Sequence, residues 1–214
     1  MTTLIVVRHG ESVSNLNATF TGQTDSPLTE LGHEQARRTA EYLKDRHIDV
    51  IYSSDLSRAM QTAQPTAEMH GLPIHPDTRL REIYGGDWEL RNGDEISALY
   101  PQSYALWKES VYLGTPDGGE SFLQVADRTN EFLSEILQKH RGQCVAIFSH
   151  ALAVRTFACR WFGIPYEKVN DVPWASNASV SEVNYEDDGT VAIVSYAYNA
   201  HQGDKKTFLS KGLA

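Results

Sequence analysis

Positive charge is scarce in this sequence. Its 214 residues include 19 lysines and arginines against 28 aspartates and glutamates, which gives a formal net charge of −9. A protein that binds nucleic acid without sequence preference needs the opposite sign over its surface, because the phosphate backbone supplies most of the attraction. Anionic membrane surfaces are disfavoured for the same reason. Composition therefore argues against both nucleic acid and membrane as partners.

Cysteines and long apolar runs are also few. The two cysteines, Cys144 and Cys159, cannot build a disulfide framework, and both have apolar neighbours, as reduced core residues do. The longest apolar runs, Leu4–Val7 and Cys144–Phe148, are far shorter than the roughly 20 residues of a membrane-spanning helix. The N-terminal residues lack the basic and apolar regions of a signal peptide. We therefore expect a cytoplasmic protein.

Spacings typical of transition-metal sites are missing. The eight histidines are scattered, with no H-x-x-H, H-E-x-x-H or C-x-x-C pattern. We expect neither a bound metal nor another cofactor.

Short apolar runs alternate with amphipathic segments along the chain, a pattern typical of an α/β protein. The expected strands are Thr3–Val7, Ile48–Tyr52, Leu72–His75 and Gln143–Ser149. The expected helices run from Thr29 to about Asp45, from Ser54 or Asp55 onward, from Ser121 to Lys139, and over 151–162. Pro65 should kink or end the second of these helices, because it cannot donate to the carbonyl of Gln61.

Two further features complete the predicted fold. Ser179–Tyr185 and Val191–Tyr198 flank the turn signal of residues 186–189 and should pair as a hairpin at one edge of the sheet. Residues 76–120, which we call the cap, are rich in Gly, Pro and aromatics, with short helices expected near 94–100 and 103–110. We predict one domain over residues 1–214. It is a three-layer α/β/α sandwich with a mostly parallel central sheet, an edge hairpin and a small inserted helical cap.

Polar side chains follow the predicted strands where each strand ends. Arg8 and His9 follow the first strand, His150 follows the fourth, and Arg58 lies on the first turn of the helix after the second. Ligands of open α/β sheets bind beyond the carboxyl ends of the strands. Guanidinium groups and helix N-termini are groups that bind phosphate. Each residue alone has an ordinary structural explanation, but all four at one edge predict a phosphate site.

A series of motifs resembles those of the histidine phosphatase superfamily, the phosphoglycerate mutase-like enzymes. The match runs in order over about residues 3–198, and the set is far more specific than any one short string. The motifs are Arg8-His9-Gly10-Glu11-Ser12 with Asn15; Thr24–Thr29 with Gly32–Ala36; Ser54–Ala59 with Gln61–Ala63; Leu80–Glu82 followed by Gly86 and Trp88-Glu89; Pro116–Ser121; and Ser149-His150.

The resemblance implies a role for each matching residue. His9 would be the nucleophile that forms a phosphohistidine, and neutral imidazole is available near pH 7 because its ordinary pKa is about 6.5. Arg8, Arg58 and His150 would hold the phosphate oxygens. Glu82 would be the general acid and base, although the residues alone do not distinguish it from its acidic neighbours. Further residues expected to bind phosphate or substrate are Asn15, Gly22 and Gln23.

The sequence departs from the family pattern at three positions. Ala151 stands where glycine usually follows the second histidine, close to the expected phosphate pocket. Leu90 replaces the glycine that usually follows the Trp-Glu pair, and Ser14 replaces a common aromatic residue. None of these changes removes a residue with an assigned catalytic role, although Ala151 could change the rate or the choice of leaving group.

Phosphatases and mutases of this family share the site, so the signature does not separate them. Gln35-Ala36, Trp88-Glu89 and the short chain favour a phosphatase, whereas Phe20-Thr21-Gly22 resembles the mutase loop. We expect hydrolysis of small phosphomonoesters by a histidine acid phosphatase-like enzyme. The alternatives are a cofactor-dependent phosphoglycerate mutase-type phosphotransferase and a non-catalytic phospho-ligand or protein-binding module. The expected partner is a small phosphorylated metabolite, and a homodimer is possible.

Two regions carry open alternatives. Aromatic residues of the cap could line the substrate pocket or form a small core of their own: Tyr84, Trp88, Tyr100, Tyr104 and Trp107. The C-terminal tail, residues 199–214, could fold over the pocket and attract anionic substrate through Lys205, Lys206 and Lys211. The common alternative for such a tail is a frayed terminus.

Overall fold

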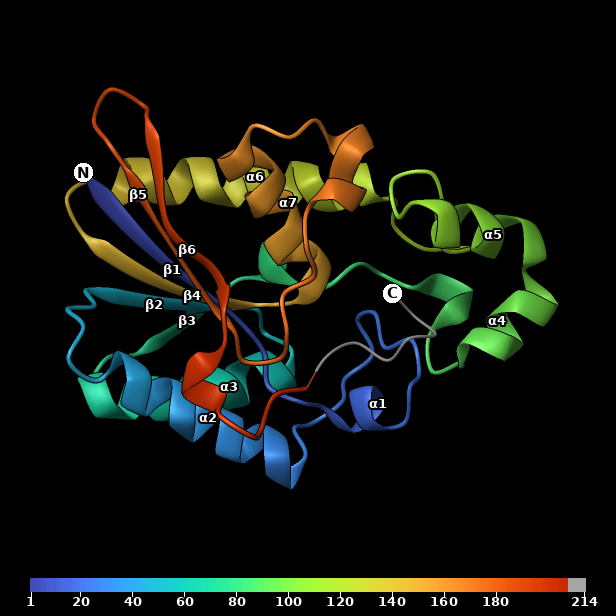
Figure 1. Cartoon of the computed structure of the whole chain (residues 1–214), viewed down its shortest axis with the longest axis horizontal. Coiled ribbons are helices and arrows are strands. Elements are labelled where there is room, and N and C mark those ends of the chain that lie inside the picture. The colour runs from blue at the N-terminus through green and yellow to red at the C-terminus, as the bar shows by residue number, and fades with distance from the viewer. Residues whose placement is uncertain (208–214) are drawn as a thin grey trace.

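The central sheet of the computed structural model, which describes residues 1–207, has six strands in the order β3-β2-β4-β1-β5-β6 (Figure 1). The first four strands of that order run parallel, and β5 and β6 are antiparallel to their neighbours. The strands are β1 (Thr2–Arg8), β2 (Val50–Ser53), β3 (Ile74–Pro76), β4 (Cys144–Ser149), β5 (Val180–Tyr185) and β6 (Val191–Tyr198). The mostly parallel sheet and the edge hairpin are confirmed.

Helices cover both faces of this sheet and make the three-layer sandwich that the sequence predicts. One layer holds α2 (Glu30–Leu43) and α3 (Ser57–His70), and the other holds α6 (Phe122–Lys139) and α7 (Ala151–Phe162) (Figure 1). Alternate residues of β1 serve the two layers, because successive strand side chains point to opposite faces. Leu4 and Val6 join the core on the α6 and α7 side, whereas Ile5 and Val7 join the core of α2 and α3.

Capping residues fix where the long helices begin. Thr29 accepts a hydrogen bond from the backbone N–H of Gly32 at the start of α2. Ser121 and Gln124 form the predicted capping box at the start of α6. The apolar stripe of α6 is fully buried in the sheet-facing core, with Phe122, Phe132 and Ile136 among its members.

The expectation that Pro65 kinks or ends its helix is wrong in one respect: α3 continues to His70. Proline removes one helical hydrogen bond. Thr66 and Ala67, which follow it, are buried, and this packing holds the last turns in place. The short strands are also shifted: β2 begins at Val50 and β3 at Ile74, each two residues later than expected. A short helix missing from the prediction, α1 (Val13–Leu16), follows β1.

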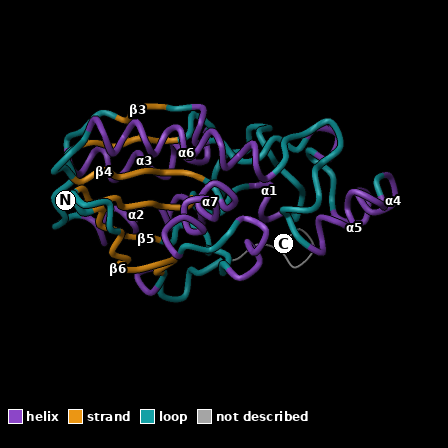
Figure 2. The backbone as a smooth tube through the Cα atoms, turned by 90° about the horizontal axis from the view of Figure 1, so that it is seen from above, coloured by secondary structure: helices purple, strands orange, loops and turns teal. Residues whose placement is uncertain are grey.

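The cap is inserted between β3 and α6, and its helices α4 (Gly93–Leu99) and α5 (Pro101–Glu109) extend beyond one end of the sheet (Figure 2). Both lie near their predicted positions. Two 3-10 helices precede them, η1 (Thr78–Leu80) and η2 (Gly86–Trp88). Trp88 is fully buried and meets Tyr104 and Trp107 edge to face, so the cap aromatics do form a core. Tyr84, in contrast, is exposed.

The described part of the C-terminal tail packs against α2. It contains the 3-10 helix η4 (Ala200–Gln202), whereas a further 3-10 helix, η3 (Tyr166–Asp171), lies earlier in the chain. Gln202 is fully buried and donates to the carbonyl of Gln35 and the hydroxyl of Thr39. Residues 199–207 are therefore not frayed. Of the lysines in the expected lid over residues 199–214, Lys205 and Lys206 lie in this described part, whereas Lys211 lies outside the described residues.

Two observations bear on the sequence-based expectation of location. Within residues 1–207, no helix has the length and apolar character needed to cross a membrane. Cys144 and Cys159 are both free thiols, and burial raises the pKa of each to about 11.

Candidate active site

Three parallel strands end at one level and place the predicted site residues together. Arg8, the last residue of β1, lies opposite Ser149, the last residue of β4. The backbone N–H of His9 donates to the carbonyl of Ser149 at 2.9 Å, and Ser54 after β2 donates to the carbonyl of Phe148 at 2.9 Å. This register brings the rings of His9 and His150 to a centroid distance of 5.0 Å, although 141 residues separate them in the chain.

His9 is held as a neutral imidazole with one free nitrogen. Its Nδ1 lies 2.7 Å from the carbonyl oxygen of Gly10. A carbonyl can only accept, so Nδ1 carries the proton and Nε2 keeps its lone pair. Burial lowers the pKa of His9 well below its ordinary value of 6.5, and the positive charges of Arg58 and Arg8 lower it further. The neutral ring therefore offers the Nε2 lone pair to the pocket.

The backbone around His9 is fixed by close packing. Gly10 lies against the turn at Gly32, where an added Cβ would come within 2.7 Å of a carbonyl oxygen, so only glycine fits there. The side-chain amide of Asn177 donates to the carbonyls of both His9 and Gly10, at 3.2 Å each. The backbone at His9 is thus fixed by groups from two distant segments.

Arg8 and Arg58 are two buried cations beside this ring, each 1% exposed. Arg8 donates to the carbonyl of Ala175 at 2.6 Å, and its buried Nε has no partner among the described residues. Arg58 donates to the carbonyl of Gly22 at 2.7 Å. Burial lowers the pKa of both guanidiniums to about 10, which still leaves them charged at neutral pH. Two buried positive charges next to a free Nε2 suit a phosphate group.

His150 lies behind Arg58 rather than along the pocket wall. Its Nδ1 accepts from Nε of Arg58 at 3.2 Å, so the proton of the neutral ring is on Nε2, which lies 2.8 Å from the hydroxyl of Ser54. Burial lowers the pKa of His150 well below 6.5, as do the charges of Arg58 and neighbouring groups. The sequence predicts direct contact of His150 with phosphate. In this arrangement both its ring nitrogens are used to orient Arg58 and Ser54.

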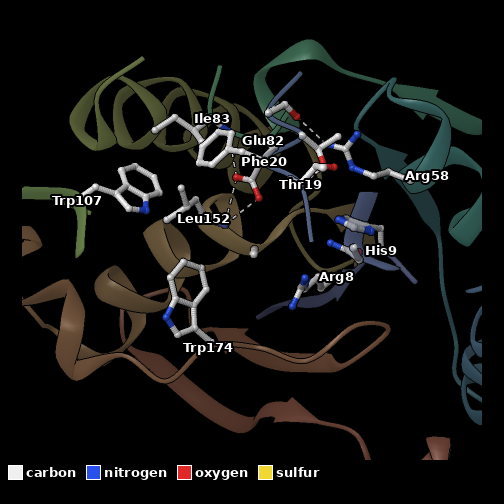
Figure 3. A pocket seen from close by; sticks show the side chains of 14 residues that line it. Arg8, His9, Thr19, Phe20, Arg58, Glu82, Ile83, Trp107, Leu152 and Trp174 are labelled. Carbon is white, nitrogen blue, oxygen red and sulfur yellow. Dashed lines mark hydrogen bonds between the residues drawn. The ribbon is translucent and has the colours of Figure 1, made fainter. Parts of the chain in front are cut away.

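Glu82 projects into the same pocket from the segment between η1 and η2 (Figure 3). Its carboxylate accepts from the backbone N–H of Ile83 at 3.0 Å and from that of Leu152, on the first turn of α7, at 3.2 Å. The helix N-terminus therefore orients the carboxylate. Glu82 is the only acidic side chain among the described residues that line this pocket.

Arg128 of α6 holds the backbone that carries Glu82. Its guanidinium donates to the carbonyls of Arg79 at 2.8 Å, Arg81 at 2.6 Å and Glu82 at 2.9 Å. Glu120 pairs with the same guanidinium at 2.8 Å. Sequence reasoning missed this residue, because an arginine on the polar face of an amphipathic helix gives no local signal of such a role.

Of the remaining predicted residues, Asn15 and Gly22 line the pocket and Gln23 does not. Asn15 accepts through Oδ1 from Asn177 and Ser12, which leaves its Nδ2 for a ligand. Gly22 has φ of +52°, and a Cβ there would come within 2.2 Å of the carboxylate of Glu89, so glycine is required. Gln23 instead donates to the carbonyl of Glu82 at 3.1 Å and supports the segment that carries the general acid candidate.

Comparison with known proteins shows the family of this chain. The model of the histidine phosphatase superfamily (branch 1) matches residues 4–197. The chain belongs to this superfamily. No group of three or more His, Cys, Asp or Glu side chains that could hold a metal ion is found within residues 1–207.

Curated relatives of this histidine phosphatase superfamily member have differing names. Phosphoserine phosphatase 1 of Hydrogenobacter thermophilus is 34% identical over 95% of this chain and 96% of its own. Glucosyl-3-phosphoglycerate phosphatase of Mycolicibacterium vanbaalenii is 32% identical over 82% and 81%. Probable phosphoglycerate mutase GpmB of Escherichia fergusonii is 34% identical over 87% and 86%.

Solved structures of the superfamily share the fold closely. YhfR of Bacillus stearothermophilus superposes with a TM-score of 0.89 at 32% identity, covering 94% of this chain and 99% of its own. A mycobacterial glucosyl-3-phosphoglycerate phosphatase in complex with VO3 gives a TM-score of 0.84 at 29% identity, over 92% and 99%. The α/β sandwich and the family resemblance are therefore confirmed.

The wall of the pocket away from the arginines was only partly predicted. Trp107 lines it, as the sequence allowed for the cap aromatics, but Phe20, Ile83, Leu152 and Trp174 line it as well. Ala151, the departure from the family glycine, also faces this pocket and is 4% exposed. Trp174 comes from the segment between η3 and β5, where no motif marks it.

Proposed function

We propose that this chain is a metal-independent phosphatase that hydrolyses small phosphomonoesters through a phosphohistidine on His9. The observation that carries the proposal is the state of His9: a neutral ring whose free Nε2 shares a pocket with two buried guanidiniums. The names of two curated relatives, phosphoserine phosphatase and glucosyl-3-phosphoglycerate phosphatase, support hydrolysis as the reaction.

In the first step, Nε2 of His9 attacks phosphorus in line, and the bond between phosphorus and the ester oxygen breaks. Arg8 and Arg58 stabilise charge on the equatorial oxygens, which is most of what phosphoryl transfer requires. His150 and the carbonyl of Gly22 hold Arg58 in place for this task. Glu82 gives its proton to the leaving alcohol oxygen, so the product departs as a neutral alcohol.

In the second step, water replaces the alcohol. Glu82, now ionised, takes a proton from this water, and the water oxygen attacks the phosphorus of phosphohistidine. The P–N bond breaks, inorganic phosphate leaves, and His9 returns to its neutral form. Division into two steps replaces one difficult hydrolysis with two easier displacements. The two arginines supply the positive charge that metal ions supply in other phosphoryl-transfer sites.

A mutase is the second candidate, because the site chemistry is the same until the second acceptor is chosen. Several curated relatives carry the name probable phosphoglycerate mutase GpmB. A mutase would return the phosphoryl group to another hydroxyl of the substrate instead of to water. The outcome that favours this reading is isomerisation of 3-phosphoglycerate faster than hydrolysis of any ester.

The free thiols support a reducing compartment, and we propose that the protein acts in the cytoplasm on a phosphorylated metabolite. Homodimer formation stays a prediction.

Hydrolysis of a panel of sugar phosphates, nucleotides, phosphoglycerates and phosphopeptides tests the proposal. We expect full activity in excess EDTA and its loss in His9→Ala. The matched control is His33→Ala, which removes an exposed histidine of α2 and should keep wild-type activity. Phosphatase activity that survives His9→Ala, or that EDTA abolishes, would contradict the proposal.

A further inference from the structure

The pocket has two ends of opposite character. In Figure 3, Arg8, His9 and Arg58 lie at one end, Trp107 and Trp174 lie at the other, and Glu82 lies between them. A phosphate bound by the arginines would therefore direct its ester oxygen toward Glu82 and its alcohol toward the indoles.

The surface around the alcohol is mainly apolar. Its apolar members are Phe20, Ile83, Trp107, Leu152 and Trp174. Apart from Glu82, the polar groups nearby are the hydroxyls of Thr19 and Thr21, the amide of Asn15, and the indole N–H of Trp107, which has no hydrogen-bond partner among the described residues. A pocket with large apolar walls and few polar groups selects its ligand mainly by apolar contact.

Contacts within the protein hold Phe20 and Trp174 in place. Phe20 is 7% exposed and meets Trp88 and Trp107 edge to face, with ring centroids 5.7 and 5.6 Å apart. The guanidinium of Arg155 lies 4.0 Å from the ring centroid of Trp174 and is itself held by the carbonyl of Val169. Such preorganised walls bind a rigid group with little loss of conformational entropy.

Cations are absent from the alcohol end among the described residues. Two arginines line the pocket as a whole, Arg8 and Arg58, and both lie at the phosphate end (Figure 3). Arg155 is 2% exposed, is separated from the pocket by the indole of Trp174, and does not line it. A carboxylate on the alcohol would lose its hydration without a cationic partner at this end of the pocket. Burial of an unpaired charge is strongly unfavourable.

We propose that this site selects phosphomonoesters whose alcohol is uncharged, apolar and ring-bearing, and discriminates against alcohols that carry a carboxylate. This inference rests on the proposed phosphatase function and defines its substrate class. Phosphoserine and phosphoglycerate, named for the relatives, both carry a carboxylate, so this chain differs from those proteins in its substrate.

A pair of esters with similar leaving groups tests the proposal without interference from leaving-group acidity. The pair is 2-phenylethyl phosphate and 4-(phosphonooxy)butanoate, both phosphates of primary alcohols. We expect kcat/KM to favour the phenylethyl ester by about tenfold or more, the range for a contact difference of this size in an apolar pocket. L-phosphoserine and 3-phosphoglycerate should follow the carboxylate ester.

One substitution then locates the preference in the apolar wall. In Trp174→Leu, the ratio of the two kcat/KM values should fall by about tenfold, because an aromatic surface is lost. The control Phe162→Leu changes an exposed aromatic residue at the far end of α7 and should leave the ratio unchanged.

The outcomes separate this inference from the proposed function. If the wild type hydrolyses both esters and the carboxylate ester is equal or better, the substrate class is wrong and the phosphatase stands. If no phosphomonoester is hydrolysed, both fail. The wild-type comparison decides the matter even if Trp174→Leu does not fold.

Discussion

Substitution of Arg128 tests whether Glu82 acts as the general acid. Arg128 holds three carbonyls of the segment that carries Glu82 and pairs with Glu120. In Arg128→Met these carbonyls lose their charged donor. The site is largely closed to solvent, because the side chain of Arg128 is only 16% exposed. Water replaces only part of the lost hydrogen bonds to the carbonyls, so we expect a loss of about 2–4 kcal/mol in the free energy of unfolding. For a chain of this length, that lowers the melting temperature by about 5–15 °C.

The effect on catalysis should depend on the leaving group. A displacement of the acid by about 1 Å costs roughly 10²-fold in rate. That loss should appear with alkyl phosphates, because their alkoxide needs a proton to depart. It should be much smaller with 4-nitrophenyl phosphate, because nitrophenolate leaves without one. Glu82→Gln should show the same dependence on the leaving group.

Steady-state assays with both esters, below the melting temperature of each variant, provide the measurement. Arg128→Lys keeps a donor for the carbonyls and should recover part of the alkyl phosphatase activity. Arg37→Met, an exposed arginine of α2, is the control and should match the wild type. Equal losses with both esters in Arg128→Met and in Glu82→Gln would refute the assignment of Glu82 as the acid.

Three other outcomes are expected. The pKa of His150 is lowered in the folded protein, so the unfolded chain binds more protons below about pH 6.5. The free energy of unfolding should therefore fall from pH 7 to pH 5. Calorimetry should show a shallower fall in His150→Asn. In Asn177→Ala, the carbonyls of His9 and Gly10 lose a hydrogen-bond donor. Steady-state assays should show a fall of about tenfold in kcat, because the ring of His9 is less well positioned. An unchanged kcat would contradict this prediction. Deletion of residues 200–214 should lower the melting temperature, because it removes buried Gln202 and its hydrogen bonds to α2. An unchanged melting temperature would contradict a stabilising role of these hydrogen bonds.

The sequence was sufficient to place the residues at the strand ends. Arg8, His9 and His150 follow buried apolar runs, and parallel strands with such ends must meet at one edge. Arg58 could be placed because it follows a strand by few residues. In each case the position depends on local pattern and on one topological rule.

The residues that sequence reasoning missed reach the site by tertiary contact alone. Asn177 and Trp174 come from an irregular segment more than 160 residues from His9, and no periodicity or capping signal marks them. The role of Arg128 depends on the bent backbone between Arg79 and Glu82, which propensity does not predict. The hydrogen bond from Arg58 to Nδ1 of His150 depends similarly on tertiary packing, which the sequence pattern does not predict.

The position of phosphate on His9 tests the central claim most directly. The wild-type enzyme is mixed with a phosphomonoester, quenched in alkali during turnover, and examined by ³¹P nuclear magnetic resonance and peptide mapping. Because the carbonyl of Gly10 holds the proton on Nδ1, the account predicts acid-labile phosphohistidine at Nε2 of His9. Phosphate on Nδ1 of His9, or on another residue, would contradict it.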